Sequence, residues 1–155
     1  CYPLSPISAY ALLNISEKVA QNERTLFTFV SKEEPFSMAK YIVEHNGEKT
    51  DSWLITPDLI YDYFKNIFKK EVSNEFIHTE WINADYAISK ADSEKKRKIL
   101  KILSVINIIN KFEELPATEE ILAISSGLSD AKDVIRELVT DKLIYKKGSN
   151  NCYTY

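Results

Sequence analysis

The side chains best suited to chemistry in this sequence are basic ones. They form a run of four, a pair one helical turn apart and an adjacent pair: Lys95, Lys96, Arg97 and Lys98; Lys132 and Arg136; Lys146 and Lys147. Ammonium and guanidinium groups bind phosphate oxygens, so these residues are candidate contacts with nucleic acid or with a partner protein. So few cations would release few counterions, and DNA binding through them would be weak and salt-sensitive. The alternative interpretation of the run of four is the solvated end of a helix.

A second candidate group is the polar tetrad Gln21-Asn22-Glu23-Arg24, which separates two apolar stretches. A guanidinium can bind two phosphate oxygens at once and can stabilise a phosphoryl group during transfer. Arg24 is therefore a candidate contact with a phosphate or with an interface. The alternative is a corner between two helices, in which Glu23 and Arg24 pair with each other.

No other residues have the spacing of a catalytic or metal centre. His45 and His78 form no H-E-x-x-H pair, and no serine or cysteine lies in a nucleophile-elbow context. Cys1 and Cys152 lie at opposite ends, which excludes the common zinc-site spacings. The carboxylates between 71 and 85 are expected on the wet face of a helix, and the aromatic residues between 27 and 81 are expected in the core. The sequence thus predicts no enzymatic activity, cofactor or metal site for this chain.

Glycine is scarce, and its distribution excludes a class of protein. Gly47, Gly127 and Gly148 are the only three, and each is isolated. A phosphate-binding loop needs several glycines close together so that backbone N–H groups can approach the phosphate. The chain is therefore not a complete P-loop or Rossmann nucleotide-binding domain.

The elements that must hold these residues are mostly helices. Ser5-Pro6 and Thr56-Pro57 each place a capping residue before a proline, which is typical of a helix start. Further helices are expected near 26–30, over 37–45 and over 74–90, because apolar residues recur there at helical spacing. Alternating strand patterns occur only near the end of the chain. The sequence predicts a mainly α fold.

From Ser93 onward the order of elements predicts a winged helix, the variant of helix-turn-helix that ends in a β-hairpin. A long helix is expected over 93–111. Thr118 should cap a helix over 119–126, and Ser129 should cap a further helix over 130–142 after a turn at Gly127. Strands are expected over 143–147 and 152–155. We therefore divide the chain into a helical domain, residues 1–92, and a winged-helix domain, residues 93–155, the hairpin of which is expected to be truncated.

The charge of the predicted winged helix argues against a sequence-specific DNA reader. Such a reader needs net positive charge and polar contacts at the start of its second helix. The helix expected over 130–142 carries four acids against three bases. Contact with protein, or a spacer role, is therefore favoured. The alternative is a DNA-binding transcriptional regulator with a helical ligand-binding or dimerisation domain in front of its winged helix.

The ends of the chain and its apolar runs indicate whether the chain is part of a larger protein and where in the cell it is expected. The sequence begins at Cys1 and stops at Tyr155 inside the expected hairpin, so we expect a fragment of a larger protein. No apolar run approaches the roughly 18 residues of a membrane span. We expect a cytoplasmic protein that does not contact a membrane, in keeping with its few cysteines.

The stretches from Tyr2 to Phe29 and from Thr56 to Phe64 resemble a segment of large bacterial P-loop (AAA-type) ATPases, including ones associated with phage defence. The resemblance implies a lid-like helical domain and a winged-helix extension that follow an ATPase core of the same chain. That core would bind ATP and Mg²⁺ and would be the partner of this segment. Arg24 would then sense the nucleotide, positioned by Asn22 and Glu23.

Overall fold

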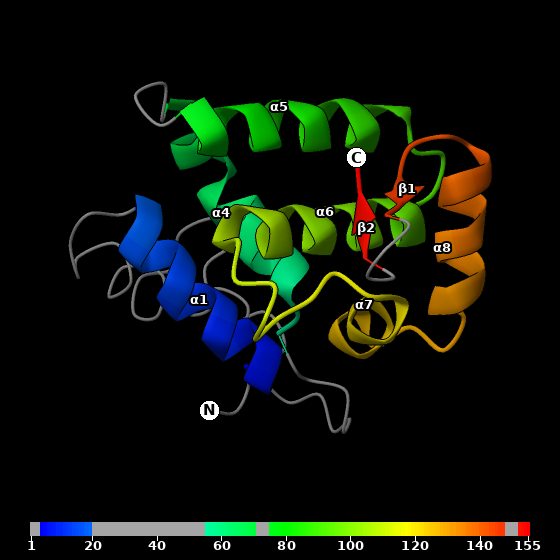
Figure 1. The fold of residues 1–155 in the computed structure, drawn as a ribbon, viewed down its shortest axis with the longest axis horizontal. Coiled ribbons are helices and arrows are strands. Elements are labelled where there is room, and N and C mark those ends of the chain that lie inside the picture. Colours follow the sequence, from blue (N-terminus) through cyan, green and yellow to red (C-terminus); the bar gives the residue numbers. More distant parts are fainter. Residues whose placement is uncertain (1–3, 20–54, 71–74, 148–151) are drawn as a thin grey trace, which may run out of the picture.

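The computed structural model describes residues 4–19, 55–70, 75–147 and 152–155. Within these ranges the fold is mainly α, with six helices and one antiparallel pair of short strands (Figure 1). The mainly α class expected from the sequence is confirmed. The helices expected near 26–30 and over 37–45 lie outside the described residues. In chain order the elements are α1 (Pro6–Val19), α4 (Pro57–Lys70), α5 (Glu75–Lys90), α6 (Glu94–Ile109), α7 (Glu119–Ser126), α8 (Ala131–Thr140), β1 (Tyr145–Lys146) and β2 (Tyr153–Thr154).

The starts of α1 and α4 lie side by side. Ser5 caps α1, because its Oγ accepts a hydrogen bond of 3.1 Å from the backbone N–H of Ser8. The Ser8 hydroxyl donates to the carbonyl oxygen of Ile55 at 2.6 Å, and Leu4 forms a parallel bridge with Ile55. Both predicted helix starts are therefore confirmed, and these contacts fix them to each other.

Helix α6 is the centre of the molecule. It packs against α1, α4 and α5 and also against α7 and α8 (Figure 1). Its apolar side chains point in nearly every direction and are almost fully buried, which suits a helix enclosed by neighbours: Ile99, Leu100, Ile102, Leu103, Val105, Ile106, Ile108 and Ile109. One hydrophobic core therefore extends across the predicted boundary between 92 and 93. The division into two domains stays a prediction.

Two of the three caps predicted in the C-terminal part are present. Ser93 Oγ accepts from the backbone N–H of Lys96 at 3.2 Å, and Thr118 Oγ1 accepts from that of Ile121 at 3.3 Å. Gly127 ends α7 in the left-handed conformation, with φ 68°. The cap predicted at Ser129 is wrong. Helix α8 begins one residue later, with Asp130 at the N-cap position and no side-chain capping bond there.

Helix α8 also ends earlier than predicted, at Thr140 instead of Lys142. Lys142 has a left-handed backbone, with φ 60°. Its N–H donates to the carbonyl of Val139 at 3.0 Å, and the N–H of Leu143 donates to that of Leu138 at 3.1 Å. These bonds form a Schellman motif, in which glycine usually occupies the position of Lys142. They leave Lys142 and Leu143 outside both helix and strand.

The hairpin is shorter than the predicted strands, and Tyr145 pairs with Thr154 while Lys146 pairs with Tyr153. On the other edge of β2, Thr118 forms an antiparallel bridge with Cys152. The N–H of Tyr153 also donates to the carbonyl of the residue before Thr118 at 2.8 Å. The segment that precedes α7 thus lies along β2, opposite β1.

Among the described helices, none has the length and apolar character needed to cross a lipid bilayer.

Candidate functional site

The basic run at the start of α6 does not form one basic surface, because its side chains make separate contacts. Lys95 Nζ lies 2.8 Å from the carboxylate of Asp130. Arg97 pairs with Glu94 on the same helix and donates to the carbonyl of Ala91 at 3.2 Å. These contacts hold the first turn of α6 in place and reduce the charge that it offers to a ligand.

Of the four basic residues in the run, Lys96 has the most ion-pair partners. Its side chain is 8% exposed, and its Nζ lies 2.8 Å from Asp92, 2.9 Å from Asp141 and 3.7 Å from Glu137. The hydrogen bonds that Lys96 Nζ donates to Asp92 and Asp141 raise the pKa of Lys96, and the bond from Lys96 lowers the pKa of Asp92. Lys96 therefore joins the start of α6 to the end of α8 and is not available to a phosphate.

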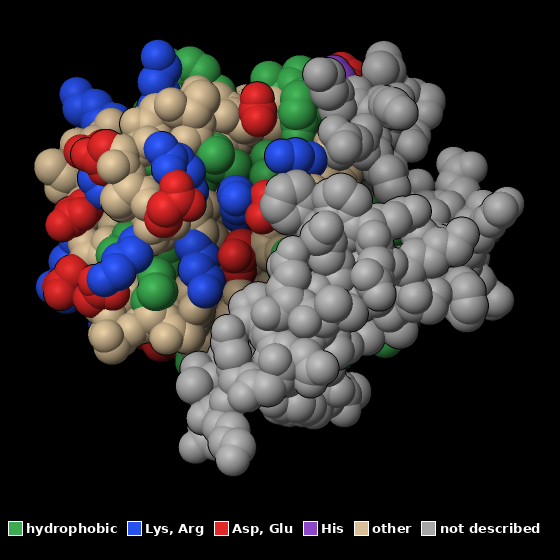
Figure 2. Space-filling model, turned by 180° about the vertical axis from the view of Figure 1, so that it is seen from behind, with side chains coloured by type: hydrophobic (Ala, Val, Ile, Leu, Met, Phe, Trp, Pro, Cys, Tyr) green, Lys and Arg blue, Asp and Glu red, His purple; other side chains and the backbone are tan. Residues whose placement is uncertain are grey.

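Helix α8 carries the next two candidates, Lys132 and Arg136, and both are exposed. Arg136 lies 3.7 Å from Asp133, with both side chains about three-quarters exposed (73% and 75%). On the described part of the face shown in Figure 2, basic and acidic side chains interleave and do not separate into a basic patch. The exposed side of α8 is thus of mixed charge.

On the hairpin, Lys146 and Lys147 are exposed. Lys147 Nζ lies 5.4 Å from the centroid of the Phe112 ring, within the range of a cation–π contact. Burial raises the pKa of Glu80 on α5, and the charge of Lys147 opposes this shift. Lys147 therefore helps to hold the hairpin against the connection after α6, which leaves Lys146 as the freer cation of the pair.

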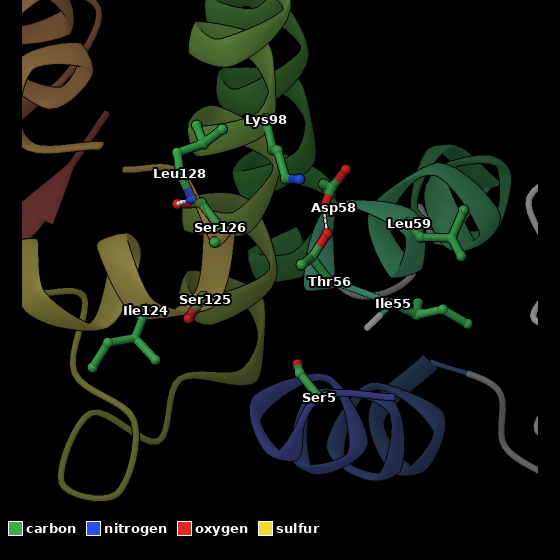
Figure 3. Close-up of a pocket in the computed structure, with 11 residues that line it drawn as sticks. Ser5, Ile55, Thr56, Asp58, Leu59, Lys98, Ile124, Ser125, Ser126 and Leu128 are labelled. Atoms are coloured by element: carbon green, nitrogen blue, oxygen red, sulfur yellow. Dashed lines mark hydrogen bonds between the residues drawn. The ribbon is translucent and has the colours of Figure 1, made fainter. Parts of the chain in front are cut away.

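Lys98 lies apart from the rest of the run, in a groove of about 530 Å³ between the starts of α1 and α4 and the end of α7 (Figure 3). Its ammonium group points toward Asp58 from the opposite wall. No carboxylate among the described residues lies within ion-pair distance of Lys98. The hydroxyls that line the groove already have partners: Ser125 and Ser126 donate to backbone carbonyls of α7, and Thr56 pairs with Asp58.

A second groove, of about 360 Å³, lies between α5 and the connection from α8 to β1. Three large side chains in its lining are well exposed: Ile82 at 47%, Tyr86 at 63% and Tyr145 at 57%. The lining as a whole comprises Ile82, Asn83, Tyr86, Ala87, Lys142, Leu143, Tyr145 and Tyr155. Sequence reasoning missed both grooves, since each joins segments that are distant along the chain. The one feature of the sequence that pointed to the second groove was Tyr145, an aromatic residue in the first predicted strand of the hairpin.

A buried polar cluster lies between α4, α5 and α6. Tyr155 donates its hydroxyl to the carbonyl of Leu100, and burial raises its pKa well above the ordinary value. Burial also raises the pKa of Tyr61. A phenol of ordinary pKa is already neutral near pH 7, so these shifts create no group that titrates there. Tyr61 lines neither groove, and Tyr155 lines the second. The packing of these groups indicates a structural role.

The structure does not test the remaining candidates from the sequence. Asn22, Glu23 and Arg24 lie outside the described residues. Within the described part of the chain, no three His, Cys, Asp or Glu side chains gather so that they could hold a metal ion. No protein-family model, no curated protein and no solved structure matches this chain.

Proposed function

We propose that this chain is a non-catalytic contact segment of a larger protein, in which α6, α7, α8 and the hairpin form a winged helix that binds protein. One observation carries the proposal. Acidic groups of α8 and its flanks bind two of the lysines that would otherwise face DNA, because Asp130 holds Lys95 and Asp141 holds Lys96. These pairs are internal to the unit and fix α8 to α6.

The arrangement of the strands supports the winged-helix assignment. Three helices and a hairpin follow one another, with Thr118, just before α7, bridged to Cys152 beside β2. In a DNA reader of this kind, α8 would enter the major groove with its first turn against base edges. That turn instead has Asp133 exposed beside Lys132, where a phosphate or a base acceptor would be repelled.

The resemblance to P-loop ATPases suggests the larger protein to which the segment belongs. In this proposal the segment follows an ATPase core that binds ATP and Mg²⁺ in the cytoplasm, and it transmits the nucleotide state to a partner. Arg24, with Glu23 and Asn22, is the candidate sensor of the nucleotide. The coding sequence upstream of Cys1 should then contain G-x-x-x-x-G-K-[ST]. An upstream region without this motif would reject the ATPase part of the proposal.

Duplex binding by the isolated chain tests the contact function against the alternative, a DNA-binding transcriptional regulator. Lys132 and Lys146 favour that alternative, because both are exposed with no ion-pair partner among the described residues. Fluorescence anisotropy with labelled duplex DNA at low salt should show no saturable binding. Saturable binding that is weakened by Lys132→Ala and by Lys146→Ala would establish the regulator and refute the contact function.

A further inference from the structure

The groove between α5 and the α8–β1 connection has the character of a small contact site. Apolar and aromatic side chains form its walls, and Ile82, Tyr86 and Tyr145 remain well exposed although each could be buried by a partner. Tyrosine is enriched at the centres of protein interfaces because it adds a large area at low entropic cost. A volume of about 360 Å³ is enough for one or two large side chains.

Lys142 supplies an independent observation. It lines this groove from a left-handed backbone position, where glycine is the favoured residue because a Cβ atom is strained there. Residues held in such conformations gather at functional sites. Glycine would relieve the strain at this position, and the lysine found there adds a basic residue to the lining of the groove.

The charge of the lining indicates which ligand. Lys142 is the one charged residue among the described residues of the lining, and Lys90 Nζ lies 5.5 Å from the centroid of the Tyr86 ring at the same groove. Asp141 precedes Lys142 in the chain, but its carboxylate is bound to Lys96 at 2.9 Å. The described lining thus contains a lysine and no carboxylate, so the groove complements an acidic group next to an apolar one.

We propose that this groove binds a short acidic segment of a partner protein, with an apolar side chain seated among Ile82, Tyr86 and Tyr145 and a carboxylate on Lys142. The inference rests on the proposed contact function and specifies where and what that function contacts. Single-stranded nucleic acid, which would stack its bases on the tyrosines, is the competing occupant. The aliphatic walls and the single cation that the described lining contains favour the peptide, since a nucleic acid strand needs a groove of cations along its backbone.

An NMR titration of the full chain tests the proposal. The probe is a short synthetic peptide in which leucines alternate with glutamates. Two control peptides carry lysines in place of the glutamates or serines in place of the leucines, and a short oligothymidine serves as the nucleic acid. The acidic peptide should shift the backbone amide signals of Ile82, Tyr86, Lys142 and Tyr145, and each control should bind at least about tenfold more weakly. Shifts confined to other residues, no shifts at all, or tighter binding of oligothymidine would overturn the proposal.

Two variants separate a binding role from a structural one. Tyr86→Ala should weaken the acidic peptide about tenfold or more without unfolding the protein, because the side chain is 63% exposed. Lys142→Gly should raise the melting temperature by relieving the strained backbone, and it should still weaken the peptide several-fold. Lys132→Ala, which removes an exposed lysine from α8, is the matched control and should bind as the wild type does. Unchanged peptide affinity in Lys142→Gly would refute the role of the lysine.

The two proposals fail in different ways. Absence of peptide binding together with absence of duplex DNA binding rejects this groove and leaves the contact function to another surface. Saturable duplex binding through Lys132 and Lys146 rejects the contact function itself.

Discussion

At the scale of single residues, Lys96 shows how the fold redirects a charged side chain. Three carboxylates lie within 3.7 Å of its Nζ, and it is almost fully buried although it belongs to the most basic stretch of the sequence. A buried ammonium group needs such partners because desolvation disfavours its charge. A lysine from the predicted basic run is therefore held by carboxylates of the protein itself.

The ion pairs of Lys95 and Lys96 predict an acid-sensitive fold. Each lowers the pKa of an aspartate, Asp130 and Asp92 respectively, from an ordinary value of 3.8. A carboxyl group whose pKa is lower in the folded state stabilises that state above the ordinary value, and this contribution is lost as the pH falls through the lowered value. The free energy of unfolding, measured by urea titration, should therefore decrease as the pH falls below 3.8.

Lys96→Met should make this decrease shallower, because the pKa of Asp92 returns toward its ordinary value. Lys132→Met is the matched control, since Lys132 is exposed and has no ion-pair partner among the described residues. An equal pH dependence in Lys96→Met and in the wild type would contradict the assignment.

At the scale of elements, the helix caps are the features that local sequence predicts best. Ser93 and Thr118 cap as expected because the capping bond joins residues three apart and needs no tertiary contact. Ser129 fails because the helix begins one residue later. The side chain at that N-cap position, Asp130, binds Lys95 from α6. A contact between residues 35 apart in the chain thus competes with a local cap.

The different positions of Ser93 and Ser129 predict different effects of the same substitution. Ser93→Ala should lower the free energy of unfolding by about 1 kcal/mol, since one N–H of α6 loses its partner. Ser129→Ala should change it by less than about 0.5 kcal/mol, because this exposed serine makes no capping bond. Urea denaturation measures both, and a similar loss in the two variants would show that Ser129 does cap α8.

At the scale of the whole molecule, α6 is shared by the helices on both sides of it. Leu103 lies on this helix and is fully buried, and the core around it joins α4 and α5 to α7 and α8. A core that is continuous across residues 92 and 93 should unfold cooperatively. The predicted division into two domains requires two separable transitions instead.

Leu103→Ala distinguishes these outcomes. The cavity it leaves should lower the free energy of unfolding by about 2–5 kcal/mol, with a single shifted transition in calorimetry and in circular dichroism. Ile124→Ala is the control, because Ile124 is 70% exposed and should have little effect. Two transitions, of which only one shifts, would instead support the division at residue 92.

The sequence by itself determined the mainly α class, the starts of α1, α4, α6 and α7, and the glycine turn after α7. These features depend on helical periodicity and on bonds between residues a few positions apart, which the order of residues specifies directly. It also indicated that α8 and its flanks carry no net positive charge. It did not locate the strained backbone of Lys142, since the end of a helix shifts easily by two residues.

Only the tertiary structure decided which groups the basic side chains contact. Lys96 meets Asp141 across 45 positions of the chain, and Lys98 faces a groove whose other wall comes from α4. The second groove joins Tyr86 on α5 to Lys142 and Tyr145 beyond α8. Such contacts arise when apolar faces of distant helices pack together, and the periodicity of one helix does not identify its neighbour.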